Sequence, residues 1–413
     1  MSTKEARLKR IQDAIALQEP DRVPFIPINQ TYPILNAGYT MAEVLYDYNK
    51  GADAFIKYAE QYQPDDIMGH AYMHMGMGPA FELMKLETVT WAGAPDHKIG
   101  ENSIHQFIEF AVLHDDEMDF FRTNYSGWLF ERGIPRISNL LGPMAHWGIS
   151  TMGLRYDISN FAAAISAPES RQMIKTLWQI DDLVQGVNTQ AAALEAKLEA
   201  MGFPMLYKGI VQVPYDLYTD WYRGTIEATY DLYDNEDIIL QFSAKALAES
   251  LEFLSLQAQW WPGKFVFMPL HKGMDGFMSD DQYEKFYWKD LQTQINHIID
   301  CGMTPYVYTE GPYTSRLEFL KEVPKGKVIY HFEECDMAKA KKVLGGTACI
   351  SGGFPVYLLH FGTKQQVIDE CKRLIDTCAP GGGFIFETSS GFDNAKPENV
   401  EAMVQTVKEY GKR

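Results

Sequence analysis

The apolar residues between Met303 and Gly391 fall in four short runs, each ending in polar residues and separated from the next by an amphipathic stretch. The runs are MTPYVYTEG, KVIYHFEE, ACISGGFP and GGFIFETSSG. A parallel β-strand is buried on both faces and so reads as a short apolar run, and the chain needs an intervening helix to return to the same edge of the sheet. The pattern therefore predicts alternating strands and helices around a parallel sheet.

Four earlier runs complete the set of predicted strands: DDIMGHAY, NLLGPMA, LYKGIVQ and KFVFMPL. About eight strands with helices between them match a (β/α)₈ barrel. We therefore expect one α/β domain over residues 1–413, a distorted TIM barrel with an N-terminal helical extension over residues 1–62 and an inserted β-hairpin over about residues 81–109. A doubly wound open sheet is the alternative, although no GxGxxG or Walker motif supports a nucleotide site at its edge.

Two predicted helices carry clear end signals. The opening helix places Leu8, Ile11 and Ala14 on one stripe and ends before Pro20. A later helix begins after Ser279, whose hydroxyl can cap free backbone N–H groups, and continues to about residue 300.

Composition narrows the range of partners. The formal net charge of −18 speaks against binding to nucleic acid or to an anionic membrane surface, because both need basic patches. No apolar run is long enough to span a bilayer, and the N-terminus lacks the apolar core of a secretory signal. Five cysteines without a CxxC pair indicate reduced thiols. We expect a cytoplasmic protein that acts on a small molecule or binds a protein partner.

Candidate chemistry lies at the carboxyl ends of the predicted strands, where barrel enzymes place their active sites. The polar residues at the ends of the last four runs are Tyr308, Glu310, His331, Glu333, Ser351, Glu387 and Ser390. The preceding strand ends in His271 and Lys272. The polar residues of the last four runs form the primary site hypothesis.

Several motifs resemble those of the uroporphyrinogen decarboxylase superfamily, which includes cobalamin-dependent methyltransferases. They are EPDRVPF near the start, LLGPMA in the middle, KVLGGTACISGGFP, GGGFIFETSSGF and the terminal KPENVEAMVQTVKEYG. Each motif alone is weak, but their order and spacing make the resemblance fairly specific. It implies a distorted (β/α)₈ barrel with the active cleft at the carboxyl ends of the strands.

The chain departs from two branches of that superfamily. The stretch PFIPINQTYPILNAGYT has no Arg or Lys, where the resemblance implies an arginine clamp for tetrapyrrole carboxylates, so uroporphyrinogen is disfavoured as a substrate. Thiol-methylating members hold zinc through His-x-Cys-Gly and Cys-Gly. Here the corresponding residues are Tyr308 to Gly311 and Ser390-Gly391, so methylation of a thiol is also disfavoured.

The chain is most similar to the corrinoid-dependent O-demethylases. The resemblance implies transfer of a methyl group from a small aryl methyl ether to the cobalt of a corrinoid (cobalamin) carried by a partner protein. The expected partners are this corrinoid protein and a small-molecule methyl donor. A homodimer is one possible assembly of the chain. Other O- or N-methyl donors, or a different acceptor, remain open.

One candidate metal site consists of Glu310, His331 and Glu333. Because side chains alternate along a strand, His331 and Glu333 share a face, and Glu310 ends the neighbouring predicted strand. Two carboxylates and an imidazole suit Zn²⁺ with an open position that could polarise an ether oxygen. The structural alternative is a carboxylate–imidazole hydrogen bond that organises the strand ends.

A proton donor is needed when an aryl ether is broken, because a phenolate leaves. Tyr308 and His271 are the catalytic candidates beside Glu310, with Lys272 next to them. A tyrosine at a strand end can equally be a packed residue with a bonded hydroxyl.

The remaining substrate-binding candidates are His70, Tyr72, His74, Lys272, Glu387 and Ser390. The spacing of two in the first three suits one face of a strand, but a register slip would reverse that face.

Two other functions compete with methyl transfer. A decarboxylase of a small acid, needing no cofactor, would use Glu310 or His70 as the acid and Lys272 or Arg155 as the carboxylate partner. A non-enzymatic module that binds a corrinoid protein is the third alternative.

Overall fold

The computed structural model describes residues 3–69, 73–147 and 158–412, and its centre is a parallel sheet of six strands. The strands lie in the order β3-β4-β5-β6-β7-β8, so that neighbours in the chain are neighbours in the sheet. This order, with helices on the outside, is that of a (β/α) barrel. The bounds are β3 (Tyr207–Ile210), β4 (Phe265–Leu270), β5 (Thr304–Pro312), β6 (Ile329–Glu334), β7 (Cys349–Gly352) and β8 (Phe384–Ile385).

An N-terminal segment, residues 23–28, continues the barrel beyond β8. Phe25 forms a parallel bridge with Phe386, and the N–H of Ile26 donates to the carbonyl of Phe386 at 3.1 Å. Part of the stretch predicted as an N-terminal extension therefore runs beside the last strand. The predicted distorted barrel is confirmed, although among the described residues its ring of strand-to-strand hydrogen bonds is not continuous.

Two of the eight predicted strands are not regular strands. NLLGPMA lies in a 3₁₀ helix, η4 (Asn139–His146), so the strand prediction there was wrong. Pro143 cannot donate to a sheet, and Ser138 caps the helix by accepting the N–H of Leu140. DDIMGHAY forms no strand as far as Gly69, and its last three residues lie outside the described part of the chain.

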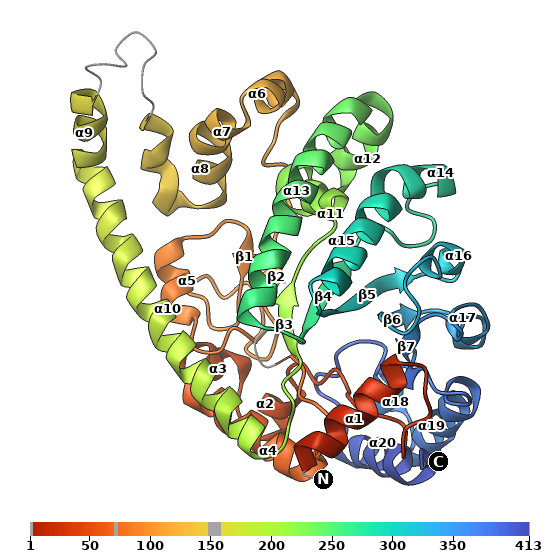
Figure 1. Cartoon of the computed structure of the whole chain (residues 1–413). Coiled ribbons are helices and arrows are strands. Elements are labelled where there is room, and N and C mark those ends of the chain that lie inside the picture. The colour runs from red at the N-terminus through yellow and green to blue at the C-terminus, as the bar shows by residue number, and fades with distance from the viewer. Residues whose placement is uncertain (1–2, 70–72, 148–157, 413) are drawn as a thin grey trace.

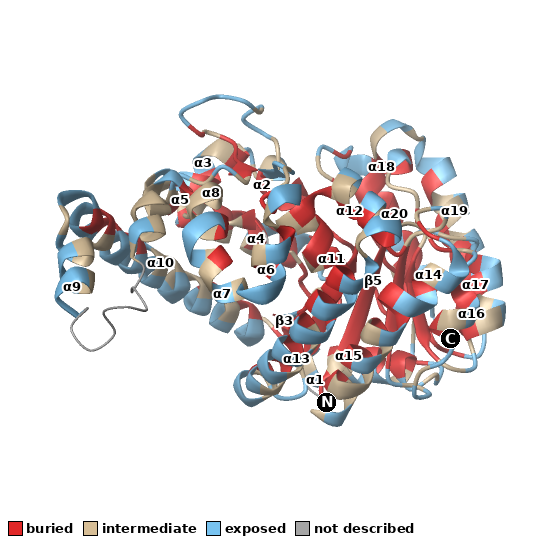
Figure 2. Cartoon of the chain, turned by 90° about the horizontal axis from the view of Figure 1, so that it is seen from above, coloured by how far each residue is buried: buried red, intermediate tan, exposed pale blue. Residues whose placement is uncertain are grey.

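Helices cover the outside of the barrel, with their apolar faces against the sheet (Figures 1 and 2). Their bounds are α11 (Pro214–Tyr218), α12 (Thr225–Asp234), α13 (Glu236–Trp260), α14 (Asp280–Tyr283), α15 (Lys289–Asp300), α16 (Leu317–Leu320), α17 (Met337–Leu344), α18 (Tyr357–Phe361), α19 (Lys364–Cys378) and α20 (Pro397–Tyr410). Two one-turn π-helices interrupt this set, η6 (Thr219–Arg223) and η7 (Glu284–Trp288). None of the helices in the described ranges is both long and apolar enough to cross a membrane.

The residues before β3 form a helical region that carries the predicted hairpin. Its strands are β1 (Val89–Thr90) and β2 (Gln106–Phe107), paired antiparallel. The long helix α10 extends away from the barrel, and α9 lies at its far end (Figure 1). The helices are α1 (Thr3–Ile15), α2 (Tyr32–Asn36), α3 (Met41–Tyr46), α4 (Tyr48–Tyr62), α5 (Gly78–Met84), η2 (Asp115–Glu117), α6 (Met118–Thr123), α7 (Tyr125–Trp128), η3 (Leu129–Gly133), α8 (Ile134–Ile137), α9 (Ile158–Ser166) and α10 (Pro168–Ala200).

The helix α1 packs its predicted apolar stripe against the starts of the strands. Ile11 and Ala14 are fully buried in one cluster with Phe265, Ile329 and Ile385. Phe265 and Ile329 are the first residues of β4 and β6, and Ile385 is the second residue of β8. The helix α1 therefore covers the end of the barrel opposite to the predicted site. The predicted cap at Ser279 is also confirmed.

A buried carboxylate, Asp65, ties α1 to the segment of residues 23–28. It accepts hydrogen bonds from Arg10 at 2.6 Å, from Arg22 at 2.8 Å and from the N–H of Phe25 at 2.7 Å. The Asp65 side chain is fully buried, so loss of this carboxylate would leave two guanidinium groups without their shared partner.

We therefore expect Asp65→Ala to lower the free energy of unfolding by about 3–5 kcal/mol, the usual cost of removing one partner of a buried ion pair. The measurement is chemical denaturation followed by circular dichroism. Glu318→Ala, which removes an exposed ion pair with Lys321, is the control and should cost less than about 1 kcal/mol. Equal effects of the two substitutions would contradict the role of Asp65.

Candidate active site

Charged side chains gather at the barrel mouth, the region beyond the carboxyl ends of β4 and β5. The Nδ1–H of His271 donates to Asp220, and its Nε2 lies 3.5 Å from Glu310 Oε1. Lys272 Nζ lies 3.4 Å from Asp220 Oδ1 and 4.0 Å from Glu109 Oε2. These five residues are called the mouth cluster below. The structure brings the predicted His271, Lys272 and Glu310 together and adds two carboxylates that the sequence did not suggest.

A further buried carboxylate, Asp216 on α11, holds the end of β4 in place. It accepts the backbone N–H of His271 at 3.0 Å, the N–H of Lys272 at 2.9 Å and the hydroxyl of Tyr287 at 2.6 Å. Burial raises the pKa of Asp216 to about 6. Because one carboxylate binds two consecutive amides, the backbone at His271 and Lys272 is held in place by α11.

The π-helical turn η6 follows α11 and supplies Asp220. Such turns are rare and are frequent at functional sites. Arg223 anchors this turn: it is 2% exposed, and its Nε donates to Asp231 at 2.7 Å. On the same turn the indole N–H of Trp221 donates to Gln212 at 2.9 Å, and the Gln212 amide donates to Asp220 at 3.4 Å. Asp220 is therefore held by the anchored turn on which it lies and by the Gln212 amide.

The two neighbouring carboxylates, Asp220 and Glu310, keep the His271 ring protonated. Burial acts to lower its pKa, but the hydrogen bonds to Asp220 and Glu310 outweigh this effect and raise the pKa to about 10. At neutral pH each ring nitrogen therefore carries a proton. The side chain is 26% exposed, so this proton donor is partly accessible to solvent at the mouth.

A second group of polar residues lies inside the barrel and is called the interior cluster: Tyr207, Tyr306, Tyr308, His331 and Glu387. The sheet register sets Tyr308 beside His331 and His331 beside Ser351. The His331 Nδ1 lies 2.7 Å from Glu387 Oε2, and its Nε2–H donates to the carbonyl of Ser389 at 2.9 Å.

Tyrosines complete the interior cluster. Tyr306 donates to Glu387 Oε2 at 2.8 Å and Tyr207 donates to Oε1 at 3.2 Å. The Tyr308 ring stacks on the His331 ring, with centroids 4.4 Å apart. Burial, and then the nearby Glu387 charge, raise the pKa of Tyr207 and Tyr306 far above the ordinary tyrosine value. The interior cluster is therefore a largely buried network held by hydrogen bonds around Glu387, of the kind named as the structural alternative for His331.

The three predicted zinc ligands do not converge. Both nitrogens of His331 face acceptors of the chain itself, Glu333 accepts the N–H of Gly311 at 2.7 Å, and Glu310 faces His271. Within residues 3–69, 73–147 and 158–412, no group of three His, Cys, Asp or Glu side chains is arranged to hold a metal ion. The residues present therefore do not fit the predicted metal site.

The other predicted residues are spread out. His70, Tyr72 and Arg155 lie outside the described residues. His74 contacts His105, with ring centroids 4.4 Å apart, and burial lowers the pKa of His105 to about 4. Ring contacts continue from His105 to Phe107 and from Phe107 to Trp221, so the hairpin reaches the mouth.

The last two substrate-binding candidates lie near the interior cluster. Glu387 is fully buried within it, and Ser390 is half-buried beyond the end of β8. Asp216 and Asp220 were missed, although their spacing of four on one helical face, directly after a strand, is a signal for paired carboxylates.

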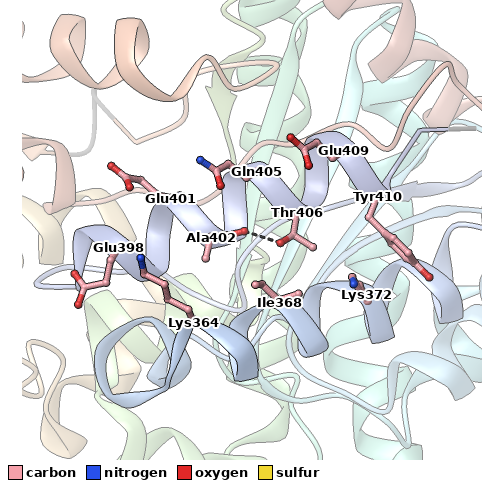
Figure 3. A pocket seen from close by; sticks show the side chains of 10 residues that line it. All are labelled: Lys364, Ile368, Lys372, Glu398, Glu401, Ala402, Gln405, Thr406, Glu409 and Tyr410. Atoms are coloured by element: carbon pink, nitrogen blue, oxygen red, sulfur yellow. Dashed lines mark hydrogen bonds between the residues drawn. The ribbon is translucent and has the colours of Figure 1, made fainter.

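One open groove of about 610 Å³ lies elsewhere, between α19 and α20 (Figure 3). Its walls carry Lys364 and Lys372 on one helix and Glu398, Glu401 and Glu409 on the other. It contains none of the predicted site residues and follows the furrow between two packed surface helices. The mouth cluster is therefore the candidate active site.

The fold and the mouth cluster define a barrel protein whose site lies at the carboxyl ends of its strands. The sequence model of the family "Uroporphyrinogen decarboxylase (URO-D)" matches residues 150–410, and the chain belongs to this family. Among solved structures, a "methyltransferase from Methanosarcina mazei" is similar with a TM-score of 0.59 and 13% sequence identity, over 97% of this chain and 98% of that chain. No curated protein sequence matches significantly.

We expect His271→Gln to change the pH dependence of stability. A group whose pKa is raised on folding, here from about 6.5 to about 10, contributes stability that is complete below pH 6.5 and is lost as pH rises through 10. The difference in unfolding free energy between wild type and variant should therefore be largest below pH 6.5 and shrink toward pH 10. Denaturant titrations across this range measure it.

The control for that series is His114→Gln, at an exposed position. Its difference from wild type should not shrink over the same window. A His271→Gln difference that is flat with pH would show that the ring is not a cation in the folded protein.

Proposed function

We propose that this protein is a methyltransferase that removes the methyl group of a small aryl methyl ether and passes it to the cobalt of a corrinoid carried by a partner protein. The observation that carries the proposal is the cationic His271 held between Asp220 and Glu310 at the barrel mouth. Membership of the URO-D family and the likeness to a methyltransferase from Methanosarcina mazei support the reaction class.

Breaking an aryl ether requires an acid matched to the leaving group. The electron pair of the carbon–oxygen bond stays on oxygen, so a phenolate forms unless a proton arrives. A phenol has a pKa of about 10, as the tyrosine side chain does. The pKa of His271, about 10, matches this value, and proton transfer is efficient when donor and acceptor are matched.

The two carboxylates have different roles in this proposal. Asp220 bonds the Nδ1–H and fixes the plane of the ring. Glu310 lies 3.5 Å from Nε2, a long contact that the ether oxygen could replace. Lys272 Nζ lies 3.4 Å from Asp220, the partner of His271, and in this proposal its charge stabilises the negative charge that develops on oxygen. Tyr308 stays a candidate acid, but it is 8% exposed and stacks on His331, which favours His271 as the donor.

The acceptor would be bound with its own protein, and its cobalt(I) would supply the electron pair that takes the methyl group. The rim of the mouth suits a protein partner. Phe107 is 57% exposed, Trp221 is 40% exposed and Ile226 is 68% exposed. Exposed apolar side chains grouped around a site favour docking.

The decarboxylase alternative fits the mouth less well. The cluster has three carboxylates, from Glu109, Asp220 and Glu310, and Lys272 already faces two of them. A carboxylate substrate would meet like charge there, and the two cations of the cluster, His271 and Lys272, already face these carboxylates.

The direct test mixes the protein with cobalt(I) cobalamin and methoxybenzene and follows methylated corrinoid by its absorbance. We expect methyl transfer from phenyl methyl ethers. Absence of transfer across phenyl methyl ethers, methylamines and betaines would exclude the class.

His271→Gln should slow demethylation of methoxybenzene by about 10²–10⁴-fold, the usual contribution of a general acid. The loss should be far smaller for 4-cyanomethoxybenzene, because its phenolate is a weaker base and leaves without a proton. His114→Gln should leave both rates unchanged. An equal loss for the two ethers would rule out proton donation by His271.

A further inference from the structure

A groove of about 460 Å³ lies beside β3, at the edge of the six-stranded sheet, and between that strand and α13. We propose that this groove binds a neutral aromatic compound of one or two rings, and that His271 senses its occupant. The inference does not rest on the proposed methyl transfer, because it concerns binding at a place outside the mouth cluster.

The lining of the groove is aromatic and apolar. It includes Val211, Leu217, Tyr222, Phe242 and Phe253. Tyr222 and Phe242 meet edge to face, with centroids 4.9 Å apart, and such walls favour a further ring in the same arrangements. The volume falls within the usual range for small-molecule sites.

The polar groups in the walls are already bonded within the chain. Gln212 accepts from Trp221 and donates to Asp220, and the hydroxyls of Tyr125 and Tyr222 bond each other at 2.6 Å. Ser250 Oγ donates to the carbonyl of Leu247 and accepts from Gln294.

The charged groups are engaged in the same way. Lys245 pairs with Glu249 and lies 4.9 Å above the Tyr125 ring. A charged ligand would therefore have to compete with this ion pair, whereas a neutral ring would leave it intact. The occupant that fits is neutral and apolar.

A short path leads from the groove to the mouth cluster. Trp221 lines the groove and donates to Gln212, which donates to Asp220, the partner of His271. Trp221 and Asp220 are adjacent on the π-helical turn η6. A ring that presses on Trp221 would therefore shift the carboxylate that holds His271.

The first test titrates the wild-type protein with Prodan, a neutral probe built on the two rings of naphthalene whose fluorescence changes in apolar surroundings, without any corrinoid. We expect saturable binding at one site. Phe253→Ala, at a groove position, should weaken it about ten-fold, and Leu256→Ala, equally exposed on α13 but outside the groove, should not. No saturable binding, or equal weakening by both variants, would overturn the site.

Two further measurements test whether the occupant is neutral and whether its binding is coupled to His271. Naphthalene should displace the probe at about ten-fold lower concentration than 1-naphthoate, and equal displacement would overturn the neutral occupant. Saturation with the probe should move the ¹⁵N signals of the His271 ring in wild type and not in Trp221→Phe, which keeps a ring but loses the indole donor. Equal movement in the two proteins, or none in wild type, would overturn the coupling.

Because none of these experiments contains a methyl acceptor, their failure is distinguishable from failure of the proposed function.

Discussion

The buried carboxylate of Asp216 joins the end of β4 to α11, and the arrangement of the mouth cluster depends on it. It accepts two consecutive backbone N–H groups, from His271 and Lys272, and the hydroxyl of Tyr287. A carboxylate without water is stable only with such donors, so the strand end and the helix must keep this geometry. The π-helical turn that follows α11 then delivers Asp220 to the His271 ring.

The polar residues of the barrel form two groups, one in its interior and one at its mouth. In the interior, Glu387 and His331 are fully buried and bonded to tyrosines and to the backbone, so this network stabilises the strands. At the mouth, His271 and Glu310 are partly exposed and joined by a long contact. A group that can exchange its partner is suited to catalysis, and a group whose partners are sealed from water is suited to structure.

The last six strands and the meeting of His271 with Glu310 could be predicted from sequence, because apolar runs mark buried strands and parallel strand ends share one edge. Whether Glu310, His331 and Glu333 converge on a metal ion could not be predicted in this way. His331 pairs with Glu387, which lies 56 residues later, so its partner depends on the register of the whole sheet. Asp220 was missed because its spacing of four from Asp216 is a signal only once both are known to lie on one helical segment, and the π-helical turn that directs Asp220 toward His271 leaves no pattern of apolar residues.

The proposed function depends on His271 being a cation held at the barrel mouth, ready to give its Nε2 proton. The most direct measurement is ¹⁵N nuclear magnetic resonance of the histidine ring nitrogens, with the His271 signals assigned by their loss in His271→Gln. We expect both nitrogens to carry a proton at pH 8 and the ring to titrate near pH 10. A neutral His271 ring at pH 8 would contradict the proposed function.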